Sequence, residues 1–337
     1  ELAGTASWLP PADSLVFTAN HALTTGDALI YTHGKGGSNI GGLTDGTIYY
    51  VVVVDPLTIK LAARRNDALS PMPVTLSLSA TGVTGTAHRF FQGAYSKGNA
   101  SSGTALGGNG VQSRARVGGS LTTELGGGAI QSTGQNMTVR SRAGYEALTD
   151  ARGITIAILL GVGIVDGRAT VDPTIRTGLR SNSSILATNG ILTVESDLRR
   201  AADIRGAAPG AAGLFSLAGA FVTATVAGSA ETFVGRGGAI TGRDVEIRTR
   251  TVDTATADAD AISLAFGVAL GATEANAFVN STATTHLDAS VATTGSLTVE
   301  TIATQLATAE SEASTGGLIA GQASTAIAEV GPLRSDF

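Results

Sequence analysis

Three aspartates lie close together in the C-terminal half of the chain, in the stretch VDTATADAD: Asp253, Asp258 and Asp260. Asp258 and Asp260 are two residues apart, so on a strand they share one face, where paired carboxylates can act as general acid and base or bind calcium. Together with Arg248 and Arg250 they are the one grouping that points to a polysaccharide-active site. The calcium nonapeptide G-G-x-G-x-D is absent and no other stretch repeats the grouping, so we interpret it as a solvated face.

The remaining candidates for chemistry are weaker. No histidine stands in a metal-ligand pattern such as H-E-x-x-H or H-x-H, and the chain has no cysteine, so we interpret the histidines as surface residues. The four histidines are His21, His33, His88 and His286.

Glycine-rich stretches at Gly34–Gly37, Gly107–Gly110 and Gly126–Gly128 lack the G-x-x-x-x-G-K-S/T pattern of a phosphate-binding loop and are interpreted as turns. Ser184 and Ser196 lack the G-x-S-x-G context of a serine nucleophile. We therefore expect no catalytic residue, no metal site and no cofactor.

The composition indicates a narrow core filled by small side chains. The chain of 337 residues has 45 glycines, 4% aromatic and 15% charged residues, a profile that fits neither a disordered chain nor a globule with large aromatic anchors. A net charge of −5 argues against a nucleic-acid partner. The longest apolar run, 154–165, is too short and too interrupted to span a membrane as a helix.

Two patterns recur along the C-terminal two thirds of the chain with one shared period. The pattern A-x-V-x-x-S/T-x-x-T-x-L/V begins at Ala115, Ala169, Ala224 and Ala277, in steps of 54, 55 and 53 residues. A strand-like pattern, G-x-x-L-T-V, has its anchors at Val139, Val194, Ile247 and Val299, in steps of 55, 53 and 52 residues. A fixed period of this length is typical of a stacked repeat array.

Alternation around the anchors indicates strands rather than helices. Two residues after each anchor stands a small hydroxyl residue that would face inward with it. These are Ser141, Ser196, Thr249 and Thr301. The outward position between them alternates in charge from repeat to repeat, as a parallel ladder of strands favours. It reads Arg140, Glu195, Arg248 and Glu300.

We therefore predict an all-β chain, with a β-solenoid (parallel β-helix) of about four 53-residue repeats preceded by a small antiparallel β module. Because 53 residues are long for one β-helix coil, we expect two or more rungs per repeat and an advance of roughly 10 Å for each repeat. A glycine precedes each anchor by four or five residues, where we expect a corner with positive φ. These are Gly134, Gly190, Gly242 and Gly295.

The expected organisation has four parts: a lead-in at 1–12, the antiparallel module at 13–92, a linker or irregular first coil at 93–114, and the solenoid at 115–337. Within the module, strand signals cover Ser14–Thr18, Ala28–Thr32, Thr47–Asp55, Thr58–Ala62 and Val74–Leu78. The last repeat, from Ala328, is incomplete at Phe337.

Two stretches carry resemblances. HALTTGDALIY and the residues that follow to Leu69 resemble a small all-β module of very large bacterial surface proteins and phage tail-associated proteins, which implies a spacer or display unit. The ATVDPTIRTGL…ILTVES units between Ala115 and Val330 are similar to filamentous-haemagglutinin-like and autotransporter-like β-helical adhesins. This resemblance implies a secreted, surface-exposed structural or adhesive protein and supplies no catalytic residues.

We expect a structural extracellular protein, a segment or subunit of a bacterial cell-surface filament or giant adhesin. Its partner would be a second copy, joined head-to-tail through a strand edge at Ala326–Leu333, or the continuation of a longer chain. The alternatives are a polysaccharide-active β-helix enzyme (a phage-type depolymerase or lyase) and a glycan-binding adhesin. A glycan would need aromatic platforms, for which Tyr49, Tyr50 and Tyr95 are the candidates, so we expect an adhesive site in the loops of the N-terminal module.

Overall fold

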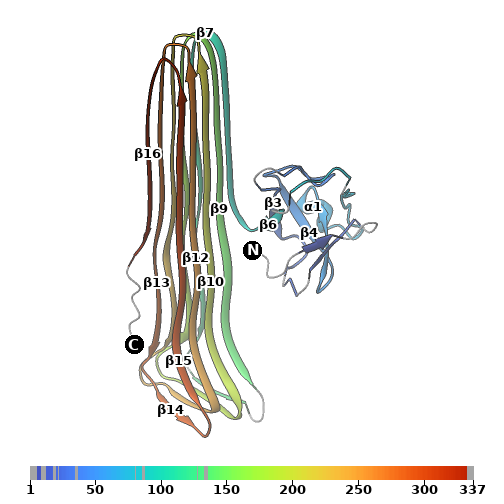
Figure 1. Cartoon of the computed structure of the whole chain (residues 1–337). Helices are drawn as coiled ribbons and strands as arrows, with labels where there is room; N and C mark the ends of the chain where they lie inside the picture. Colours follow the sequence, from blue (N-terminus) through green and yellow to red (C-terminus); the bar gives the residue numbers. More distant parts are fainter. Residues whose placement is uncertain are drawn as a thin grey trace. The chain divides into compact units, whose positions relative to one another are not determined.

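The computed structural model divides the chain into two compact units, Glu1–Tyr95 and Ser96–Phe337. Its described elements are β-strands and one short helix (Figure 1). The structure describes residues 6–8, 13–17, 20–21, 23–34, 37–79, 81–85, 88–126, 128–132 and 136–331.

The first unit is an antiparallel sheet in the order β1-β2-β5-β4-β3-β6. The chain passes through β1 (Ala6–Trp8), β2 (Leu15–Phe17), β3 (Ala28–Thr32), β4 (Ile48–Asp55), β5 (Thr58–Ala62), helix α1 (Arg65–Ala68) and β6 (Arg89–Phe91). Strands β3 and β5 coincide with the predicted segments. Val74–Leu78 was predicted as a strand and is not one; it is held by a bond from the Leu76 amide to the Leu61 carbonyl and by the buried Leu78 side chain.

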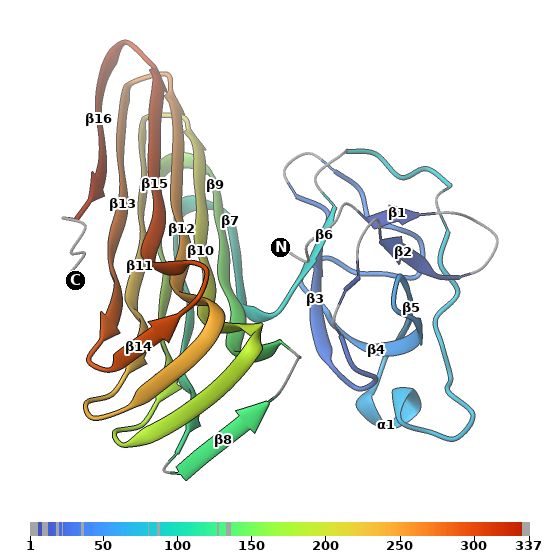
Figure 2. The same cartoon turned by 90° about the horizontal axis from the view of Figure 1, so that it is seen from below.

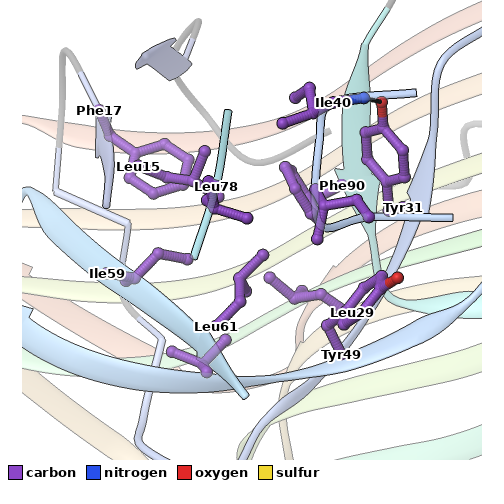
Figure 3. Close-up of a cluster of buried hydrophobic side chains, with 12 residues drawn as sticks. Leu15, Phe17, Leu29, Tyr31, Ile40, Tyr49, Ile59, Leu61, Leu78 and Phe90 are labelled. Carbon is purple, nitrogen blue, oxygen red and sulfur yellow. Dashed lines mark hydrogen bonds between the residues drawn. The ribbon is translucent and has the colours of Figure 1, made fainter. Parts of the chain in front are cut away.

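Apolar side chains from the strands form the core of this unit (Figure 3). They include Leu15, Leu29, Ile59, Leu61 and Phe90. Tyr31 is buried among them, and its hydroxyl accepts a bond from the Ile40 amide and lies 2.8 Å from His88 Nδ1. Burial raises the pKa of Tyr31 above its usual value.

The second unit is built from a large parallel sheet. Its long elements are β7 (Gly93–Leu125), β9 (Met137–Leu179), β10 (Ser183–Ala212), β11 (Phe215–Val234), β12 (Ala239–Ala265), β13 (Val268–Leu287), β15 (Leu297–Gly316) and β16 (Ile319–Val330). The short strands are β8 (Gly128–Ser132) and β14 (Ser290–Thr293). Residues 93–114, expected to be a linker or an irregular first coil, instead lie within β7, which pairs with β9.

The long strands form two facing layers (Figures 1 and 2). In what we call the ascending layer, β10 pairs with the first half of β9, β12 with β10, and β15 with β12. In the descending layer, β11 pairs with the second half of β9, β13 with β11, and β16 with β13. At one end of the sheet, short turns connect each ascending strand to the descending strand that follows it. At the opposite end there is a short parallel ladder, which consists of β8, β14 and the first residues of β10 and β12.

Neighbouring strands are offset by one sequence repeat. Val194 pairs with Val139 on one side and with Ile247 on the other, and Ile247 pairs with Val299. Each repeat therefore supplies one strand to each layer and advances the stack by one strand spacing, about 4.8 Å. The expectation of two or more rungs and roughly 10 Å per repeat is wrong, because a strand such as β11 is 20 residues long and takes up the sequence that a second rung would need.

The corner glycines do not have the predicted backbone. Positive φ is found at the turn residues Asn182 and Gly237, and not at Gly190, Gly242 or Gly295. Gly134 lies outside the described residues.

At Gly295 the requirement is space. A Cβ there would lie 2.4 Å from the Asp244 carboxylate and 2.9 Å from the Arg243 carbonyl of the preceding repeat. The close approach of two repeats, and not the φ angle, accounts for this glycine.

Candidate functional site

The structure separates the three aspartates of the candidate acidic site. Asp253 lies between the two layers and is fully buried, whereas Asp258 and Asp260 lie on the opposite face of β12. Asp258 pairs in register with Arg205 of β10 and both outward aspartates pair with glutamates of β15. Only two of the three carboxylates can therefore face a common substrate.

Asp253 instead forms a buried ion pair with Arg200 of β10. Arg200 Nε and Nη2 donate to the two carboxylate oxygens at 2.7 and 2.9 Å, and both side chains are 0% exposed. Arg200 Nη1 also donates to the Ala227 carbonyl of β11 at 2.9 Å. Ser281 of β13 donates to the Asp253 carboxylate and accepts a bond from Gln305 Nε2. One polar cluster thus joins five strands (β10, β11, β12, β13 and β15) and both layers.

Sequence reasoning missed this cluster because charged residues were expected only on the outward face. A signal was present: Arg200 and Asp253 are both six residues beyond an anchor, and so have the inward parity of Val194 and Ile247. An even spacing from a buried anchor places a residue on the buried face.

Small hydroxyl residues form a second buried set, which bridges the layers. Ser196 Oγ donates to Thr177 Oγ1 at 2.8 Å, and Thr285 Oγ1 donates to Thr249 Oγ1 at 2.9 Å. Thr301 Oγ1 lies 2.8 Å from Thr285 Oγ1. The hydroxyls that follow the last three anchors (Ser196, Thr249 and Thr301), predicted to face inward, therefore each meet the second threonine of one copy of the other sequence pattern. Ser141, after the first anchor, is buried as well, but its hydroxyl has no hydrogen-bond partner in the structure.

At the outward position that follows each anchor, the charges alternate from strand to strand as the sequence predicted. Arg140 pairs with Glu195, its Nε lying 2.8 Å from the carboxylate, and Arg248 Nε lies 2.6 Å from Glu300. The pair of Arg248 and Glu300 is partly exposed, and ion pairs at a protein surface contribute about 0–1 kcal/mol each. They favour the observed register of the strands more than they add to stability.

Asp244, at the start of the ascending part of β12, binds the following repeat. Its carboxylate accepts bonds from Arg243 Nε at 2.7 Å and from the amide and hydroxyl of Ser296 at 2.9 Å each. The bond from Arg243, followed by those from Ser296, lowers the pKa of Asp244 to about 2.

Three of the four histidines belong to the first unit, where each has a hydrogen-bond partner within the protein. His21 is buried, contrary to the surface interpretation: its Nε2 is 2.9 Å from the Asp55 carbonyl and its Nδ1 accepts from the Leu23 amide. His33 Nδ1 lies 2.7 Å from the Gly34 carbonyl. His286 lies in register with Phe233, on the outward face of β13.

The other sequence candidates also have structural partners. Ser196 belongs to the buried hydroxyl set, and Ser184 is exposed in the short ladder. Residues 35, 36 and 127 of the glycine-rich stretches lie outside the described residues. Tyr49 is buried in the core of the first unit, and the Tyr95 hydroxyl donates to Asp45 at 3.3 Å.

The edge formed by β15 and β16 is open. Each pairs with one strand only among the residues that the structure describes. Val330 of β16 is 47% exposed, whereas its equivalents in the preceding repeats, Val171, Val226 and Val279, are 0% exposed. Within residues 136–331, the inward face of β16 therefore lacks the neighbour that covers Val171, Val226 and Val279 on the earlier strands. Leu333, included in the predicted joint, lies outside the described residues.

Comparison with models of known protein families, with curated proteins and with solved structures found no match for this chain. Among the described residues there is no group of three or more His, Asp or Glu side chains that could hold a metal ion. Nor does that part of the chain contain a helix long and apolar enough to cross a membrane.

Proposed function

We propose that this chain is a structural extracellular protein of a bacterial cell surface, a segment or subunit of a filament or giant adhesin. In this proposal the two facing layers and the short ladder are the sides of a β-solenoid with one coil per repeat. The support is the offset of one repeat between all neighbouring strands of β9 to β16. The resemblance to filamentous-haemagglutinin-like and autotransporter-like proteins is consistent with it.

The mechanical properties follow from the pairing. Each repeat contacts its neighbours through two strands of about 20 residues, so the backbone ladder continues along the stack. The buried ion pair and the hydroxyl set fix each strand against the other layer. Such an array derives its stability from interfaces between adjacent repeats, which suits a stiff spacer that displays the antiparallel unit.

We further propose that copies associate head-to-tail, the open edge of β15 and β16 pairing with the β7 edge of the next copy. The observation that carries this is the exposure of Val330 where three equivalent valines are fully buried. An exposed strand edge with unpaired backbone groups is a template for pairing with another chain. Pairing with further repeats of a longer chain would provide hydrogen-bond partners for the same backbone groups of β15 and β16.

Sedimentation velocity across a concentration series tests this assembly. We expect the full chain to form concentration-dependent polymers, and Ala328→Lys with Val330→Lys to reduce them, because charges on the inward face of an edge strand oppose pairing. Thr325→Lys, on the outward face of the same strand, is the control and should still assemble. Monomers at all concentrations, or equal loss in both variants, would count against assembly through this edge.

The polysaccharide-active alternative now depends on the outward pair Asp258 and Asp260, since Asp253 is occupied by Arg200 inside the sheet. Replacement of both outward aspartates by asparagine should leave assembly unchanged. If the chain degrades a bacterial polysaccharide and the double variant loses that activity, the enzymatic alternative is correct. A glycan array separates binding without turnover from a scaffold with no glycan partner.

A further inference from the structure

One end of the parallel sheet carries no charged side chain on any of four successive repeats. This end is where the ascending strands turn into the descending strands (upper end in Figure 1). The charge-free segments, which we call the apolar end, are 153–165, 206–217, 261–273 and 313–323. Charges begin again at nearly the same level on each ascending strand. Arg152, Asp260 and Glu312 stand at equivalent positions, since Ala207 pairs with both Arg152 and Asp260, and Asp260 pairs with Glu312.

Large apolar side chains of this end point outward. At the turns, Leu214, Phe266 and Leu318 are 60%, 84% and 90% exposed. Ile158 is 70% exposed on the ascending side, and Ile164 is 43% exposed on the descending side. The apolar surface thus covers the turn and both flanking faces.

The apolar surface is at least as large as the largest apolar patch of an ordinary soluble protein. Taking on the order of 150 Å² for a fully exposed large apolar side chain, the six most exposed of the four segments present about 600 Å². These six are Ile156, Ile158, Leu214, Phe266, Leu318 and Ile319. The largest patch on a typical monomer is about 300–600 Å², and further exposed leucines and isoleucines of the same segments add to this one.

The shape and depth of this apolar surface distinguish between two kinds of partner, a second copy of the chain and the hydrocarbon of a lipid bilayer. A rigid partner, such as a second copy, covers one face at a time and brings a polar rim with hydrogen bonds. A fluid hydrocarbon phase covers the turn and both faces together. The charge-free part of an ascending strand, such as 261–266, is about 20 Å deep at 3.3 Å per residue. The hydrocarbon region of one leaflet is about 15 Å deep.

The backbone meets the condition that a hydrocarbon environment imposes. Groups that leave water must be paired inside the protein, and in this end β9, β10 and β12 have a parallel neighbour on each side in the sheet. β15 and β16 have one open side among the described residues. The strands of the inner repeats can therefore enter hydrocarbon with their backbone groups paired, whether or not another copy pairs with the open edge.

We propose that the apolar end inserts into the hydrocarbon region of one leaflet of a lipid bilayer and attaches the second unit to a membrane surface. The recognition is apolar, so attachment does not depend on the headgroup charge of the lipid or on the salt concentration.

Flotation of the full chain with phosphatidylcholine vesicles, at 0.1 M and 1 M salt, tests this. We expect the chain to float with the vesicles at both salt concentrations, and Leu214→Asp with Phe266→Asp to lower the bound fraction at least tenfold. Both side chains are exposed, so far-UV circular dichroism should be unchanged. Val252→Asp with Leu306→Asp is the matched control: both residues are exposed on the ascending layer outside the apolar end, and their replacement should not alter flotation.

A second measurement uses the absence of cysteine from the chain. A single environment-sensitive fluorophore on Phe266→Cys should shift its emission to the blue on addition of vesicles, and the same label on Leu306→Cys should not. Failure of the unaltered chain to float, or equal flotation of both aspartate variants, overturns the proposal. If the chain does not float but the Leu214 and Phe266 variant loses a dimer seen without vesicles, the apolar end is a contact between copies.

Discussion

Removing the buried carboxylate of Asp253 should strongly destabilise the second unit. In Asp253→Ala the Arg200 guanidinium stays fully buried, keeps its bond to the Ala227 carbonyl and loses both bonds to the carboxylate. A buried charge left without its partner costs about 3–5 kcal/mol of the free energy of unfolding. Ser281 also loses its acceptor and keeps Gln305 as a donor.

The double variant Arg200→Met with Asp253→Leu removes both charges together. The unpaired carbonyl of Ala227 then remains as the main cost, about 1–3 kcal/mol. We therefore expect the double variant to be more stable than Asp253→Ala by about 2 kcal/mol, although it carries one more substitution. If the substitutions only removed side-chain contacts, the double variant would instead be less stable than Asp253→Ala.

Urea unfolding of the full chain, followed by far-UV circular dichroism, measures these differences. The control is Asp197→Ala, which removes the partner of the exposed Arg142 at 3.0 Å and should cost at most about 1 kcal/mol. If Asp253→Ala is no more damaging than this control, water reaches Arg200 and the account of a dry interior is refuted.

Three further predictions concern single residues. Thr285→Val should lower the free energy of unfolding in urea by about 1–3 kcal/mol, because the hydroxyl set loses its central member; a loss below about 0.5 kcal/mol would contradict this. In Gly178→Ala the new Cβ meets the Phe233 carbonyl at 2.2 Å, so the melting temperature should fall by several degrees. The control is Gly110→Ala at an exposed position, where a Cβ meets nothing within 4 Å and the melting temperature should fall less. The carboxylate of Asp244, observed by NMR, should titrate with a pKa of about 2. Because this value lies below the unfolded value, its contribution to stability is complete above about pH 4 and is lost as the pH falls through 2; a normal pKa near 4 would show that its bonds are not formed in solution.

The repeat period and the face of each anchor could be predicted from the sequence, since strands impose a period of two and stacked units impose a fixed repeat length. Val194 and Ser196 are buried as expected, and Glu195 between them pairs with Arg140. The number of coils in a repeat could not be predicted, because period alone does not fix strand length. Strands are usually 3–10 residues long, and β11 has 20.

The buried ion pair and the apolar end show a second limit. Arg200 and Asp253 stand at the same distance from their anchors, which indicates a shared inward face, but their complete burial follows from the packing of the opposite layer, which a residue count does not contain. The run 154–165 is apolar in the sequence, yet its exposure follows from its position at the turn between two layers, where half of its side chains have no facing partner.

Cryo-electron microscopy of the full chain at high concentration tests the central claim most directly. If copies join head-to-tail through their edges, the images will contain filaments with a layer line at about 4.8 Å. β7, β9, β10, β12 and β15 supply five successive levels, so the subunit repeat along the filament should be about 24 Å. Isolated short particles at every concentration would contradict self-assembly.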